Sequence, residues 1–223
     1  MATFPHEPPV PLADDGSSHL LIEVGRTVRD NFHVLCGLSL VYLAVALPWL
    51  VLGTITSWAV AWAPLVLTTA PVWMTIVWCG DRMLAGEATT WRRALGTWRQ
   101  LLPAGMASGI PLAVCGTVLL WMAREPSETS WGRPGLVVSA GLTLTFGVLL
   151  VPAIPVALRT GLAGIRLWQV SAAVVIKRSG QIMGALVLAV AGMGLAQAIG
   201  PVMLLGVAPL GVLVAAITLP DPD

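Results

Sequence analysis

The fold is decided by residues 31–80, which read NFHVLCGLSLVYLAVALPWLVLGTITSWAVAWAPLVLTTAPVWMTIVWCG and contain no Asp, Glu, Lys or Arg. A second stretch without these charges covers residues 179–220. A helix needs about 20 apolar residues to cross the hydrocarbon of a membrane, so each stretch is long enough for two spans joined by a tight turn. The sequence therefore predicts an all-α, polytopic membrane protein.

The composition of the whole chain agrees with this fold class. Apolar residues make up 57% of the sequence and charged residues 10%, and the mean hydropathy is +0.85. A soluble domain carries about 25% charged residues because its surface must face water. A soluble protein with buried hydrophobic helices is the alternative, but a chain of 223 residues has too little polar sequence to cover two such stretches.

The chain divides into a tail and one transmembrane domain. Residues 1–17 are rich in proline and show no apolar period, so we expect a disordered tail. No basic segment precedes a short apolar one there, which predicts no cleaved signal peptide. Residues 18–223 form the single transmembrane domain. Six spans are predicted in it, at about residues 32–53, 58–79, 101–122, 135–158, 181–199 and 202–219.

We expect the six spans to form three hairpins, each preceded by a basic segment at the membrane interface. The first segment is a short amphipathic helix just before the first span. The second, residues 81–100, has apolar residues at steps of three and four opposite most of its arginines, which predicts an amphipathic interfacial helix. The third is residues 159–178, where Gly161 and Gly164 weaken the helical prediction. This order reflects either a true threefold repeat or a common membrane pattern.

Basic residues are distributed unevenly between the two sides of this topology. One side receives ten of them and the other receives Arg124 and Arg133. Because cytoplasmic loops retain Lys and Arg, both the N-terminus and the C-terminus are predicted to be cytoplasmic. The strong preference for arginine over lysine fits a bacterial chain, and we expect it in the bacterial cell (inner) membrane.

Small residues recur at four-residue steps in two of the predicted spans. Gly105 and Gly109 lie in the third span, and Gly184, Gly192 and Gly200 lie in and around the fifth. Small residues let helix backbones approach closely in lipid, so these five glycines are predicted to mediate helix packing. Packing within one chain and packing between the subunits of a homo-oligomer both fit the pattern.

Residues that could carry chemistry are scarce. No Asp, Glu, Lys or Arg lies in the middle of a predicted span, whereas proton relays and ion paths need such residues at membrane depth. The sequence has no HExxH pattern, and its three cysteines do not have metal-ligand spacing. We therefore expect no catalytic residues, no metal and no cofactor, and we predict that the protein is not an enzyme. Nothing in the sequence favours nucleic acid as a partner.

The basic side of the topology carries the candidate binding residues. Basic residues near a membrane surface attract anionic lipid headgroups, and they can also dock an acidic protein. The alternative is that these residues only fix the orientation of the chain in the membrane. The candidate lipid-binding or partner-binding residues are Arg92, Arg93, Arg99, Arg159, Arg166 and Lys177.

Residues 63–105 read APLVLTTAPVWMTIVWCGDRMLAGEATTWRRALGTWRQLLPAG and carry a family resemblance. Pro71 in the second span is followed by Arg82, the pair Gly86 and Glu87, and an aromatic-rich segment from Trp91 to Trp98. This pattern resembles the YesL-like family of bacterial integral membrane proteins. Members are often encoded near carbohydrate ABC transporters, so the resemblance implies an accessory role. It supplies no catalytic residues.

The expected function is that of a non-enzymatic integral membrane accessory or scaffold protein, associated with a carbohydrate ABC transporter or another transporter complex. A small oligomeric permease or channel is the alternative. An intramembrane enzyme acting on lipid ranks third, because no polar constellation in the sequence supports it.

Overall fold

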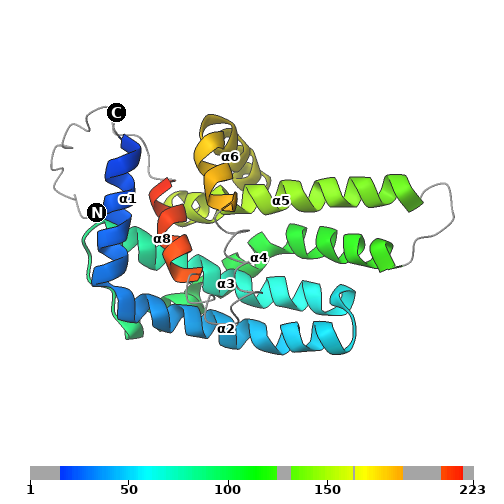
Figure 1. Ribbon diagram of the computed structural model, residues 1–223, viewed down its shortest axis with the longest axis horizontal. Coiled ribbons are helices and arrows are strands. Elements are labelled where there is room, and N and C mark those ends of the chain that lie inside the picture. Colours follow the sequence, from blue (N-terminus) through cyan, green and yellow to red (C-terminus); the bar gives the residue numbers. More distant parts are fainter. Residues whose placement is uncertain (1–15, 125–131, 163, 188–206, 218–223) are drawn as a thin grey trace.

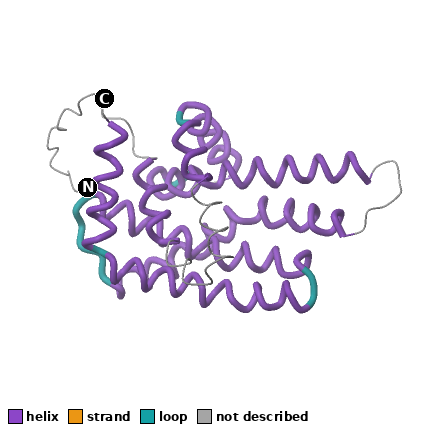
Figure 2. The backbone as a smooth tube through the Cα atoms, viewed as in Figure 1, coloured by secondary structure: helices purple, strands orange, loops and turns teal. Residues whose placement is uncertain are grey.

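A computed structural model describes residues 16–124, 132–162, 164–187 and 207–217 of the chain. Helices joined by short connections make up these residues (Figure 2), which confirms the all-α prediction. The labelled helices are α1 (Gly16–Asp30), α2 (Phe32–Ile55), α3 (Trp58–Leu84), α4 (Trp91–Arg124), α5 (Gly132–Thr160), α6 (Gly164–Lys177) and α8 (Val207–Ile217). A further helix, Ser179–Val187, follows α6 and is bent from it by 92°.

Four helices are long and apolar enough to cross a membrane, namely α2, α3, α4 and the part of α5 from Pro134 onward. They correspond to the first four predicted spans. A fifth crossing is added if α6 and the helix Ser179–Val187 are counted together as one bent span. These helices are consistent with a multi-pass membrane protein, in which each span satisfies its own backbone hydrogen bonds.

The predicted fifth span, residues 181–199, falls largely outside the described residues, and the predicted sixth, residues 202–219, is described only over residues 207–217. The structure describes only parts of them, within the helix Ser179–Val187 and α8. As described, α8 has 11 residues. That number corresponds to a length of about 16 Å, against a hydrocarbon core of about 30 Å. The predicted Pro-rich tail also falls outside the described residues, apart from its last two positions, which begin α1.

The four long helices lie side by side along the longest dimension of the molecule (Figure 1). The connection between α2 and α3 lies at one end of this bundle. The connection between α3 and α4 lies at the opposite end, where α1 and α8 are also found (Figure 1). The basic residues near the end of α3 and the start of α4 therefore gather at the same end of the bundle as α1 and α8.

One part of the predicted topology is wrong, namely the separate interfacial helix over residues 81–100. Residues 81–84 are the last turn of α3, and residues 91–100 are the first turns of α4, which runs unbroken to Arg124. The reversal between the two helices uses Gly86, whose φ of +76° favours glycine. α4 continues through Pro103 because a proline removes a single backbone hydrogen bond while α3 packs along the helix.

The other two predicted interfacial segments are helical. α1 precedes α2, and its Val24 is buried in the same core cluster as Ala208 of α8. α6 covers most of the third basic segment. Gly161 and Gly164 do not interrupt this helix, because Gly161 lies between α5 and α6 and Gly164 is the first residue of α6, with φ values of +67° and +64°. Whether these helices lie in a membrane interface stays a prediction.

α3 is the central helix of the described structure. In its candidate span 56% of the residues are buried, against 22–28% in α2, α4 and α5. Its fully buried side chains contact α2 and α8 on one side and α5 and α8 on another. They include Val72, Met74, Ile76, Val77 and Cys79. The other long helices leave more of their apolar surface exposed.

α4 packs against α3 through two of the predicted packing glycines. A Cβ atom added at Gly105 would lie 2.5 Å from Cα of Pro71, and one added at Gly109 would lie 3.2 Å from Cβ of Ala70. Both contacts lie within one chain. In lipid, a close approach of this kind is a main source of helix association, because it gains dispersion contacts and weak hydrogen bonds.

The other three predicted packing glycines are placed differently. Gly184 is exposed, and a Cβ atom added there would meet no atom within 4 Å among the described residues. Gly192 and Gly200 lie outside the described residues.

Several further glycines make close contacts that the sequence pattern did not single out, and three of them lie between the helices of the core. A Cβ atom added at Gly80 of α3 would lie 2.9 Å from Cα of Val212, and Gly211 of α8 contacts α3 in turn. Gly116 of α4 leaves room for Trp62, whose indole N–H donates a hydrogen bond of 3.2 Å to the carbonyl oxygen of residue 112. α3 is therefore approached closely by α4 on one side and by α8 on another.

Candidate functional site

The candidate site lies at the end of the bundle where α3 meets α4. Two acidic residues sit among the arginines there: Asp81 in the last turns of α3, and Glu87 in the connection that follows. The backbone N–H of Glu87 donates a hydrogen bond of 2.9 Å to the carbonyl oxygen of Arg82, which fixes the reversal. The turn thus brings residues from two long helices within reach of one another.

Glu87 holds two of these arginines. Its carboxylate oxygens lie 2.6 Å from Nη1 of Arg82 and 3.4 Å from Nη1 of Arg93. Both guanidinium groups also lie 5.6 Å from the ring centroid of Trp78. Because these side chains are 38–49% exposed, each ion pair stabilises the turn only modestly, and the cation–π contacts add to it. This cluster fixes the connection between α3 and α4.

Asp81 joins three helices. It pairs with Arg159 at the end of α5, whose Nε lies 3.1 Å from the Asp81 Oδ1 atom. The same guanidinium donates a hydrogen bond of 3.2 Å to the carbonyl oxygen of Ala215 near the end of α8. The Asp81 and Arg159 side chains are 30% and 23% exposed, so water screens this pair less than the Glu87 pairs.

α8 is held at both of its described ends by side chains of other segments. Its Ala208 N–H donates a hydrogen bond of 3.1 Å to the Ser39 hydroxyl of α2. At the other end, Arg159 donates to the Ala215 carbonyl, and Arg178 donates to the Ile217 carbonyl. Basic groups at the carboxyl end of a helix satisfy free carbonyls and complement the helix dipole. Arg159 and Arg178 therefore act as structural anchors of α8.

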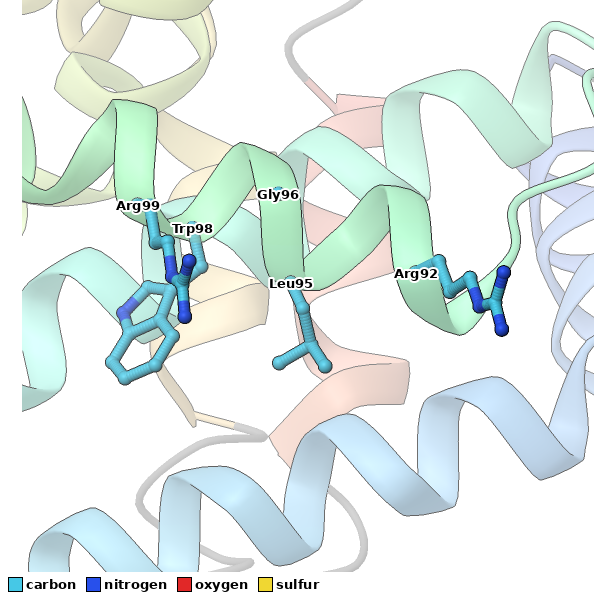
Figure 3. Close-up of a pocket in the computed structure, with 5 residues that line it drawn as sticks. All are labelled: Arg92, Leu95, Gly96, Trp98 and Arg99. Carbon is cyan, nitrogen blue, oxygen red and sulfur yellow. The ribbon is translucent and has the colours of Figure 1, made fainter.

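A pocket of about 360 Å³ lies along the first turns of α4. It is lined by Arg92, Leu95, Gly96, Trp98 and Arg99, and the side chains of Arg92, Leu95 and Arg99 leave the helix on the same side (Figure 3). In the described part of the chain, no carboxylate oxygen lies within 4.0 Å of Arg92 or Arg99. This pocket combines apolar walls with two positive charges that have no carboxylate partner in the described part of the chain.

The six predicted binding residues thus separate into three groups. Arg92 and Arg99 share the pocket, while Arg93 and Arg159 are held by Glu87 and Asp81. The remaining two, Arg166 and Lys177, lie on α6, where both are exposed. The prediction from sequence missed the role of the two acidic residues. A signal was present, because both closely follow an uncharged span and lie among arginines of opposite charge.

Residues that could hold a metal do not converge in the described ranges. No group of three or more His, Cys, Asp or Glu side chains is found there. The three cysteines are free thiols, with Cys79 buried and Cys36 and Cys115 partly exposed.

Comparison with known proteins gave no match to a protein-family model, to a curated protein or to a solved structure. The resemblance to the YesL-like family therefore stays a prediction carried by its residues. In the structure, Pro71 lies inside α3 and Arg82 in its last turn. Gly86 and Glu87 form the turn, and the aromatic segment forms the start of α4.

Proposed function

We propose that this chain is a non-enzymatic accessory or scaffold subunit of the bacterial cell membrane. In this proposal it has six spans arranged as three hairpins, both termini are cytoplasmic, and it associates with a carbohydrate ABC transporter or another transporter complex. The observation that carries the proposal is the packing of the central helix α3, which is approached closely by backbone on two sides.

The packing supports a scaffold because it favours one fixed arrangement of the helices. Gly105 places α4 directly against Pro71 of α3, and Gly80 places α8 directly against α3. A carrier that alternates between two states must slide or rock such contacts, and close packing of small residues resists that movement. The ion pairs of Asp81 and Glu87 add fixed connections at the basic end.

The exposed surface supports a role in binding. In the described residues, α4 exposes large apolar side chains along much of its length, and α5 exposes them over residues 137–144. At the basic end, Arg92 and Arg99 are exposed and form no ion pair there. The apolar surface suits lipid or the spans of another membrane protein, and the basic end suits an anionic group.

The proposed topology is tested by labelling of single cysteines. In a background with Cys36, Cys79 and Cys115 replaced by alanine, Thr56→Cys is placed in the exposed turn between α2 and α3, and Ala88→Cys in the exposed connection between α3 and α4. A membrane-impermeant thiol reagent added to intact cells should label the first and not the second. Permeabilised cells should label both. The reverse pattern in intact cells would overturn the proposed orientation.

The accessory role is tested by purification after cross-linking in the membranes of the source cells. A transporter subunit should co-purify with the tagged chain. The purified chain reconstituted alone in liposomes should give no flux of sugars or inorganic ions above empty liposomes. Flux that scales with the amount of the chain would contradict the scaffold and support the alternative of an oligomeric permease or channel.

A further inference from the structure

The pocket at the start of α4 carries positive charge that no carboxylate of the described residues neutralises. Nearby Arg82, Arg93 and Arg159 are paired with Glu87 or Asp81. Arg92 and Arg99 have no such partner among the described residues. Both line the same pocket, so an anionic occupant would be attracted by two guanidinium groups rather than one. Guanidinium groups are well suited to phosphate oxygens, which they can bind through two parallel hydrogen bonds.

The spacing of the two arginines leaves room for more than a small ion. They are separated by two helical turns, or about 10 Å along the axis at about 1.5 Å per residue. Leu95 and Gly96 lie between them, and the Trp98 ring completes the wall (Figure 3). The Trp98 indole N–H is buried and has no hydrogen-bond acceptor among the described residues. An occupant with a phosphate and an apolar part would match the two arginines and the apolar wall together.

An exposed apolar stripe runs from the pocket along the same helix. Leu95 is 41% exposed, Leu102 39% and Met106 38%. Steps of seven and four residues place them near one face of the helix. The stripe continues at Ile110, which is 52% exposed. The stripe lies on α4, which is a candidate span, so acyl chains of a lipid could pack along it within the hydrocarbon region.

We propose that this pocket binds one anionic phospholipid, with its phosphate group between Arg92 and Arg99 and its acyl chains along the Leu95 and Leu102 stripe. The inference rests on the proposed orientation of the chain, which places this end of α4 at the cytoplasmic headgroup region. It deepens that proposal by naming the ligand of the basic end. An acidic protein would match the two charges, but the apolar stripe that leads into the span favours a lipid.

The binding test uses the full chain, purified in a neutral detergent and freed of native lipid. Phosphatidylglycerol and phosphatidylcholine are added in turn, and native mass spectrometry counts the molecules retained. The parent should retain one phosphatidylglycerol in preference to phosphatidylcholine. The double variant Arg92→Gln with Arg99→Gln should bind phosphatidylglycerol about thirtyfold more weakly, since each basic residue near a membrane surface contributes about one kcal/mol.

A second variant tests the pocket without removing charge. A Cβ atom added at Gly96 would meet no atom within 4 Å, so Gly96→Phe should fill the pocket without disturbing the protein. It should weaken phosphatidylglycerol binding to a similar extent while the melting temperature stays at or above that of the parent. The matched charge control is Arg26→Gln with Arg29→Gln, two exposed arginines of α1 outside the pocket. This control should bind like the parent.

Several outcomes would overturn the proposal. Parent-like binding by Gly96→Phe would show that the lipid does not occupy this pocket, and equal losses in the site and control double variants would show diffuse attraction. Competition by free glycerol 3-phosphate would assign the site to a soluble anion, and selective binding of a glutamate-rich peptide would assign it to an acidic protein. Because the isolated chain is used, the result does not depend on whether a transporter partner is found.

Discussion

Replacing Gly105 by alanine is expected to destabilise the protein by about 1–3 kcal/mol, the usual range for an extra methyl group forced into a packed contact. The new Cβ atom would lie 2.5 Å from Cα and 2.8 Å from the nitrogen of Pro71. These are backbone atoms, so no flexible side chain can move aside. α3 and α4 must separate, and α3 is the helix on which most of the described core is built.

Gly96→Ala is the matched control for this prediction. It makes the same chemical change in the same helix, but the added Cβ atom meets nothing within 4 Å. Alanine has a higher helix propensity than glycine, so this variant should be neutral or more stable by up to about 1 kcal/mol. Unfolding of both variants in mixed detergent micelles, followed by circular dichroism, gives the comparison. Equal stability of the two would show that the α3–α4 contact is not as close as described.

The all-α fold class and the four long apolar helices could be predicted from the sequence because the underlying effect is strong. Placing a charge in the middle of a membrane is costly, so long uncharged stretches such as residues 31–80 mark spans with little ambiguity. The difference in free energy between an interfacial helix and the continuation of a span is smaller, so the sequence marks that boundary less clearly. Residues 91–100 have an amphipathic pattern that fits an interfacial helix or the start of a span. In the structure they continue into α4 as one helix, which packs closely on α3.

The arrangement of the basic end could be predicted only in part. Charge counting grouped Arg92, Arg93 and Arg159 as equivalent candidates, because a count of basic residues carries no information about their partners. The structure separates them, since Asp81 and Arg159 lie 78 positions apart in the sequence and meet only after α3 and α5 have packed. No local spacing in the sequence signals such a contact. The pairing of Glu87 with Arg82 is local and was within reach of sequence reasoning.

The second large effect is expected at this ion pair. Arg159→Met should lower the free energy of unfolding by about 2 kcal/mol, a value between that of an exposed pair and that of a fully buried pair. The substitution removes the positive charge that pairs with the Asp81 carboxylate. The Asp81 side chain is only 30% exposed, so water compensates this loss in part. It also removes the donor to the Ala215 carbonyl near the end of α8. Unfolding in mixed micelles, as for Gly105, is the measurement.

Two further variants separate the ion pair from other effects of the substitution. The double variant Asp81→Asn with Arg159→Met should be more stable than Arg159→Met alone, because it no longer leaves an uncompensated charge. The charge swap Asp81→Arg with Arg159→Asp should not restore stability. It would place a carboxylate against the Ala215 carbonyl oxygen and the negative end of the α8 dipole. A swap variant as stable as the parent would show that the Asp81 pairing matters and the contact with α8 does not.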